Sequence, residues 1–226
     1  MLNRLYPALP PGVRNRIITL WAVLLAGVLV VGGIALSLGT FIRGNVRDQL
    51  AAQQIVFTAA ADLKPEEKAE AACLTQYAGT TMTTGAQAQC YSEHYIGLHM
   101  RESAKRAGFP GATYATLGKE QTKLRADIAA AQAAGNADAV KALNDKLTAA
   151  GNLRTTMQTG STLRGQLLNA WGWDTLGMGI VATGAALFGV ALIFAVAMAY
   201  ELATKTVAVE APVVTGRVAP LAATAR

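Results

Sequence analysis

The densest group of side chains able to do chemistry lies between residues 90 and 99, where Cys90, Glu93, His94 and His99 occur together. Cys90 and His94 are four residues apart and share a helix face, but His99 follows His94 by five residues, about 140° round an ideal α-helix. Two imidazoles so placed do not converge on one ion, and the four-ligand spacings of zinc sites are absent. The spacing therefore favours polar or interfacial histidines over a metal site, with a pH-sensing role for either as an open alternative.

No motif for catalysis or cofactor binding accompanies this group. The phosphate-binding glycine loops, the nucleophile elbow and the HExxH zinc motif are all missing from the sequence. Glu66 and Glu67 form a carboxylate pair, but they follow Pro65 at an expected helix start, where the helix dipole favours acidic residues. We therefore predict a protein that is not an enzyme, with no catalytic residues, no metal and no cofactor.

Cys73 and Cys90 are the two cysteines of the chain. A disulfide between them would close a loop of 18 residues and contribute roughly 3 kcal/mol in an oxidising compartment. Two buried thiols are the alternative. The disulfide interpretation predicts that this part of the chain is exported.

Two long stretches without charge must position everything else. Residues 17–42 and 175–200 each comprise 26 uncharged residues, about 39 Å as a helix, and a hydrocarbon core is about 30 Å thick. Four aromatic residues lie where interfacial anchors are expected, namely Trp21, Trp171, Trp173 and Tyr200. We predict an all-α membrane protein with two transmembrane helices and a helical extracytoplasmic domain between them.

Charge distribution predicts the orientation. Arg4, Arg14 and Arg16 precede the first span and Lys205 follows the second, so the positive-inside rule places both ends in the cytoplasm of a plasma membrane protein, although Arg43 and Arg47 on the outer side weaken this. The predicted parts are a cytoplasmic lead (1–16), the first span (17–42), the outer domain (43–174), the second span (175–200) and a disordered tail (201–226).

Nucleic acid is not an expected partner. The chain of 226 residues carries a net charge of +6, but its outer domain has 14 Lys and Arg against 12 Asp and Glu. A nearly neutral domain lacks the basic surface that nucleic acid requires.

Small residues recur along both spans at intervals that place them on one helix face. Such stripes let helices approach closely in lipid, although glycine and alanine are also common in membrane helices for other reasons. The positions expected to pack against another helix are Ala26, Gly33, Ser37, Gly177, Gly184, Ala185 and Gly189.

The outer domain is expected to be built from short helices. The first span continues as a helix to about residue 61, a second helix capped by Asp62 ends at Gly79, and a third runs from about Ala86 to Gly108. Residues 119–150 have the pattern of a helical hairpin with a turn at Gly135, and residues 151–170 return through three glycines to the second span.

Residues 51–63, 76–100 and 162–180 resemble a group of actinobacterial two-span membrane proteins without an assigned function. In size and topology the chain is also similar to accessory subunits of the mycobacterial Mce lipid importers and of the respiratory supercomplex. The resemblance implies a non-catalytic accessory subunit of a larger integral membrane complex, in contact with membrane lipid, with the Mce association preferred.

A membrane-anchored sensor or lipid-binding module is the alternative function. Its ligand would lie among the aromatic residues Tyr77, Tyr91, Tyr95 and Phe109.

Overall fold

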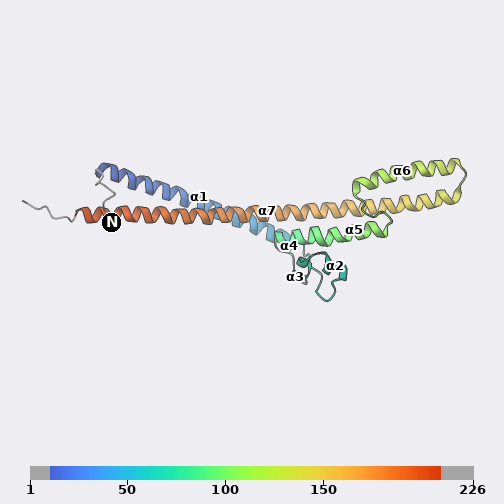
Figure 1. Cartoon of the computed structure of the whole chain (residues 1–226), viewed down its shortest axis with the longest axis horizontal. Helices are drawn as coiled ribbons and strands as arrows, with labels where there is room; N and C mark the ends of the chain where they lie inside the picture. The colour runs from blue at the N-terminus through green and yellow to red at the C-terminus, as the bar shows by residue number, and fades with distance from the viewer. Residues whose placement is uncertain (1–10, 210–226) are drawn as a thin grey trace, which may run out of the picture. The chain divides into compact units, whose positions relative to one another are not determined.

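The computed structural model describes residues 11–209, and the side chains of residues 12–203. Its helices are α1 (Pro11–Ala52), α2 (Pro65–Glu70), α3 (Ala72–Gln76), α4 (Gly85–Cys90), the π-helix η2 (Tyr91–Ile96), α5 (Gly97–Arg106), α6 (Tyr114–Ala133) and α7 (Ala137–Val209) (Figure 1). The all-α architecture predicted from the sequence is confirmed over these residues. α1 and α7 are long and apolar enough to cross a membrane by length and composition.

α1 is longer than expected at its start and shorter at its end. It begins at Pro11, within the predicted lead of residues 1–16, because proline suits a first helical position, where its missing N–H has no partner to lose. Residues 1–10 lie outside the described part. The helix ends at Ala52 rather than near residue 61, since Gln54 adopts a left-handed conformation with φ of 53° and the chain then becomes extended.

α7 runs without a break for 73 residues, so residues 151–170 return to the second span as part of one continuous helix. Gly160 allows Met100 to pack closely, because a Cβ there would be 2.6 Å from Met100 Sδ. The helix also continues to Val209, which corrects the disordered tail predicted from residue 201. Residues 210–226 lie outside the described part.

The chain forms two compact units, residues 1–36 with 182–226 and residues 37–181. In the first unit, α1 and α7 pack closely through glycines. A Cβ on Gly184 would be 2.9 Å from Leu36 N and 3.0 Å from Gly32 O, and a Cβ on Gly32 would be 3.2 Å from the Phe188 ring. Arg14 Nη2 donates to the Glu201 backbone carbonyl at 2.8 Å, and Arg14 Nε lies 3.7 Å from Glu201 Oε2, so charged residues near the ends of the apolar runs pair with each other.

In the second unit the same two helices meet through Gly39 and Gly177. A Cβ on Gly39 would be 2.7 Å from Gly177 O and 2.8 Å from Val181 N, both backbone atoms. Of the predicted packing positions, Gly177 and Gly184 lie at these contacts. Gly33 and Gly189 have nothing within 4 Å of a built Cβ, and Ala26, Ser37 and Ala185 are exposed. The contact of α1 with α7 instead uses Gly32 and Gly39, the buried glycines of α1, so packing of the other predicted positions against a further helix stays a prediction.

The segment between the long helices has its own core within the second unit. Val46 and Leu50 of α1 and Leu167 of α7 are buried with Phe57, Leu74, Met82, Ala88 and Cys90. An antiparallel pairing joins residues 55–57 to 80–82, with Phe57 N–H donating to Thr80 O and Met82 N–H to Ile55 O. The predicted disulfide between Cys73 and Cys90 is present and connects α3 to the end of α4.

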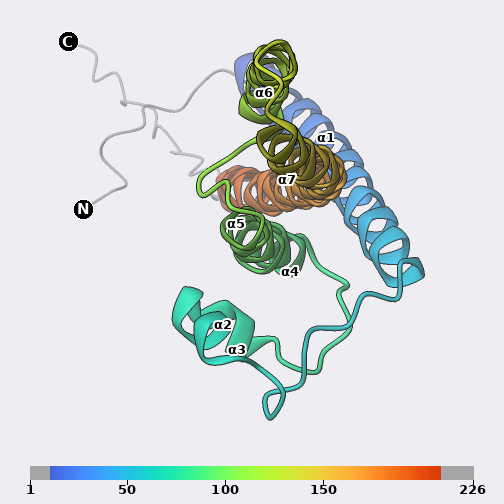
Figure 2. The ribbon, with the colours of Figure 1, turned by 90° about the vertical axis from the view of Figure 1, so that its right-hand side faces the viewer.

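The predicted helical hairpin is confirmed, although its first helix starts earlier. α6 begins at Tyr114, where the Thr113 hydroxyl accepts a hydrogen bond from Thr116 N–H. The turn contains Gly135 with φ of 67°, a conformation that glycine adopts without strain. Leu117 and Leu124 of α6 are buried against Leu153 and Met157 of α7, so α6 folds back along α7 (Figures 1 and 2).

Prediction from the glycine contacts. Gly39→Ala is expected to destabilise the protein by about 1 to 3 kcal/mol, because its methyl group would press on backbone atoms that cannot rotate away. The measurement is thermal or denaturant unfolding in lipid nanodiscs. Gly33→Ala is the matched control, with open space at its Cβ, and should leave stability unchanged or slightly raised. Equal effects of the two variants would contradict the observed packing.

Candidate functional site

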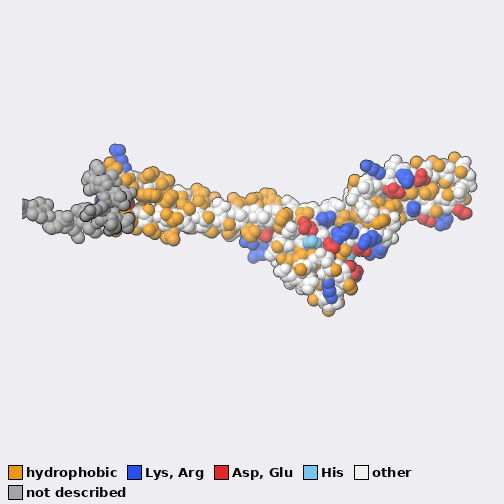
Figure 3. Space-filling model, viewed as in Figure 1, with side chains coloured by type: hydrophobic (Ala, Val, Ile, Leu, Met, Phe, Trp, Pro, Cys, Tyr) orange, Lys and Arg blue, Asp and Glu red, His pale blue; other side chains and the backbone are white. Residues whose placement is uncertain are grey.

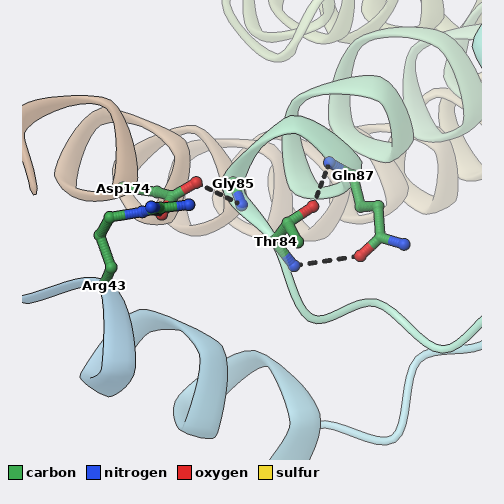
Figure 4. A network of polar contacts seen from close by, with 5 residues as sticks. All are labelled: Arg43, Thr84, Gly85, Gln87 and Asp174. Carbon is green, nitrogen blue, oxygen red and sulfur yellow. Dashed lines mark hydrogen bonds and ion pairs between the residues drawn. The ribbon is translucent and has the colours of Figure 1, made fainter. Parts of the chain in front are cut away.

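Asp174 joins three helices of the second unit at one carboxylate. Arg43 Nε of α1 donates to Asp174 Oδ1 at 3.1 Å, and the backbone N–H of Gly85, at the start of α4, donates to Asp174 Oδ2 at 3.2 Å (Figure 4). Thr84 and Gln87 cap the same helix end, with Gln87 N–H donating to the Thr84 hydroxyl at 3.2 Å and Thr84 N–H donating to Gln87 Oε1 at 3.0 Å. Asp174 directly precedes the charge-free run of α7. Its carboxylate therefore links the start of α4 to both long helices.

Both histidines face glutamates of α2. His99 Nε2 lies 3.0 Å from Glu67 Oε1, and His94 Nδ1 lies 3.6 Å from Glu70 Oε1. The 140° separation expected from an α-helix does not apply, because residues 91–96 form a π-helix, whose i→i+5 hydrogen bonds place more residues in each turn. Among the described residues, no cluster of three or more possible metal ligands occurs.

Glu67 is the buried charge of this region, with 3% of its surface exposed. Its second oxygen accepts a hydrogen bond from the backbone N–H of Lys64 at 2.9 Å, which caps α2, so Lys64 takes the position expected for Asp62. A hydrogen bond donated by His99 Nε2 to Glu67 Oε1 requires the tautomer that carries its proton on Nε2. Sequence reasoning assigned Glu67 to the helix start and missed the pairing, which arises only when α2 packs against η2 and α5.

Aromatic rings continue along the same face. Tyr91 stacks on Tyr95 with ring centroids 4.6 Å apart, and Tyr95 meets the His99 ring edge-on at 4.4 Å. Burial raises the pKa of Tyr91 to about 12, with smaller contributions from Tyr95 and Glu67. The ring of Tyr91 also meets the ring of Phe57 edge-on, with centroids 5.3 Å apart. This row of rings therefore holds His99 in place as part of a packed wall.

A groove lies between this wall and α7, with a volume of about 530 Å³. One side consists of Tyr95, Ile96, His99, Met100 and Ser103. The other side consists of Thr155, Thr156, Thr159, Gly160 and Leu163. The volume is within the range of about 300 to 1,000 Å³ typical of small-molecule sites.

The four aromatic residues expected to surround a ligand do not form one site. Tyr95 lines the groove, Tyr77 and Tyr91 pack against the core that contains Phe57, and Phe109 packs against a separate core under α6. Spacing alone did not show this, because Tyr91 and Tyr95 share the π-helix η2 whereas Tyr77 and Phe109 lie outside the helices. The groove was missed because its two sides, residues 95–103 and 155–163, lie far apart in the sequence.

The expected aromatic anchors lie on the long helices. Trp171 and Trp173 are exposed at 37% and 50% and Tyr200 at 61%, whereas Trp21 packs on Phe194 with ring centroids 5.3 Å apart. Trp21 therefore contributes to the contact between α1 and α7 rather than standing free of it.

Comparisons with protein-family models, with curated proteins and with solved structures found no match for this chain.

Prediction for the Asp174 junction. Asp174→Asn is expected to remove the ion pair with Arg43 and weaken the cap on α4, at a cost of about 1 kcal/mol. Hydrogen exchange should show faster exchange at the amides of residues 85–87. The control is Asp48→Asn, which removes an exposed pair between adjacent residues and should change neither exchange nor stability. Unchanged exchange at Gly85 in Asp174→Asn would show that the carboxylate does not hold α4.

Prediction for acid pH. A hydrogen bond from Arg101, at 2.7 Å, lowers the pKa of Glu70, with a smaller contribution from His94 and partial opposition from burial. A carboxyl whose pKa is lowered by folding stabilises the protein above its ordinary pKa, and this stabilisation is lost as the pH falls through the lowered value. Unfolding of the wild type and Glu70→Gln should therefore differ at about pH 6 and converge toward about pH 3. Glu66→Gln, an exposed neighbour, should show no such convergence.

Proposed function

We propose that the protein is a non-catalytic accessory subunit of a larger integral membrane complex, anchored by two spans with residues 43–174 on the extracytoplasmic side. The observation that carries the proposal is a disulfide-linked helical segment placed between two long apolar helices. A disulfide persists in oxidising compartments, which favours an exported middle segment.

The surfaces of the long helices fit a lipid environment. Leu20, Val23, Val30 and Ile34 of α1 and Leu192 and Ile193 of α7 are among the large apolar side chains that are more than half exposed. Figure 3 shows hydrophobic side chains over the apolar parts of these helices and charged side chains over the segment between them. Exposed apolar side chains at this density need a cover of lipid or of other membrane helices.

The accessory role is supported by a small residue that α1 and α7 do not use in their contact with each other. Gly32, Gly39, Gly177 and Gly184 are used between α1 and α7, so they are closed to a partner helix. Gly33 has open space at its Cβ, and small residues of this kind permit close approach by another membrane helix. Association with an Mce lipid importer stays a prediction from resemblance, as does the alternative of a respiratory supercomplex.

Prediction for topology. A cysteine placed at Asn144, an exposed residue of α7, should react with a membrane-impermeant maleimide added to intact cells. A cysteine added after Arg226 should react only after the membrane is opened. The native cysteines are joined to each other and so do not compete for the reagent. The reverse pattern would overturn the proposed sidedness and the role built on it.

The partner is tested by purification in mild detergent. A stoichiometric integral membrane protein should accompany the wild type and be lost from Gly33→Leu, while the variant stays folded. Gly184→Leu is unsuitable because it would disrupt the chain's own helix contact. Purification of the wild type as a lone chain would contradict the accessory role.

A further inference from the structure

The groove between α5 and α7 has the form of an elongated site. His99 and Ser103 on one side, and Thr155, Thr159 and Leu163 on the other, follow each other at intervals of four residues. Residues four apart lie on one face of a helix, so the groove follows both helices for about two turns, or about 12 Å. A ligand with an extended apolar part fits this groove better than a compact ligand does.

Part of the lining is strongly apolar although it lies outside both charge-free runs. Leu163 is 46% exposed, and Ile96 and Met100 face it across the groove with Gly160 beneath Met100. An alkyl chain lying over these residues would remove apolar surface from water, at roughly 25 cal/mol for each Å² buried.

Several polar atoms of the groove are able to accept hydrogen bonds. The hydroxyls of Thr155 and Thr156 donate to backbone carbonyls of Gly151 and Asn152 at 3.3 and 3.2 Å, so their oxygens are left to accept. His99 uses Nε2 toward Glu67, which leaves Nδ1 as an acceptor on the neutral ring. The matching ligand group is one that donates hydrogen bonds, such as a hydroxyl.

Charge narrows the ligand class further. No Asp, Glu, Lys or Arg is among the residues lining the groove, and the nearby Glu67 is buried behind His99 with 4% of its side chain exposed. A charged head group would therefore find no opposite charge in this lining. We infer that the groove binds an uncharged amphiphile, with a hydroxyl-bearing head at His99, Thr155 and Thr156 and an alkyl chain along Met100 and Leu163.

The experiment uses the full chain in phosphatidylcholine nanodiscs, with histidine labelled with ¹⁵N. The chain has two histidines, so each gives its own signal, and His94 serves as an internal reference because it does not line the groove. Hexyl β-glucoside is the probe. Its addition should shift the His99 signals in a saturable manner and leave the His94 signals in place.

Two variants on α7 make the test specific. Thr159→Trp places a large ring in the groove and should weaken the His99 response at least about tenfold, whereas Thr162→Trp, at an exposed position outside the lining, should change it by less than about twofold. If the response to the glucoside survives Thr159→Trp at full affinity, the inference is wrong.

Probes that share the alkyl chain separate the head groups. Hexanoate and hexyltrimethylammonium should bind at least about tenfold more weakly than the glucoside, because they lack its hydroxyls and the lining offers their charges no partner. Equal responses to all three would show partition of the alkyl chain alone, and a stronger response to hexanoate would indicate an anionic ligand. Either result overturns the inference. Because no partner complex is present, the outcome is independent of the proposed accessory role.

Discussion

Close approach of the backbones of α1 and α7 is the constraint on which the arrangement of the long helices depends. In each unit a pair of glycines meets where a methyl group would not fit, Gly32 with Gly184 in one and Gly39 with Gly177 in the other. In lipid there is little hydrophobic gain from pairing two apolar helices, so contact at short range has to supply the attraction. Gly32 and Gly39 are seven residues apart on α1, and Gly177 and Gly184 are seven apart on α7. This spacing keeps the contact glycines on one face of each helix.

Ion pairs near the ends of the apolar runs help to fix the register of α1 against α7. Arg14 interacts with Glu201 in the first unit and Arg43 with Asp174 in the second. These pairs are partly exposed, so each contributes modestly to stability. Their larger effect is on register, because a shift of either helix would separate the partners and leave the charges beside apolar surface.

The segment between the long helices depends on Asp174 and on a local departure from α-helical geometry. Asp174 brings the start of α4 to α1 and α7, and the disulfide holds α3 against the end of α4. His94 of the π-helix and His99 of α5 face the glutamates of α2, and His99 also lines the groove against α7 together with its neighbours on both helices. Here the short helices supply one wall of a binding site and the long helix supplies the other.

The sequence by itself determined the features that depend on local composition. The two apolar helices, the cysteine pair and the hairpin around Gly135 were all predictable, because hydrophobicity, cysteine count and turn residues act over short stretches of chain. Gly177 and Gly184 were identified as packing positions, but Gly32 and Gly39 were not, since neighbouring small residues on α1 offer several stripes and only the opposite helix selects one. The burial of Glu67 beside His99 and the close contact of Met100 with Gly160 were decided by tertiary packing. In each case the partner lies far away in the chain, and no pattern within the local sequence records it.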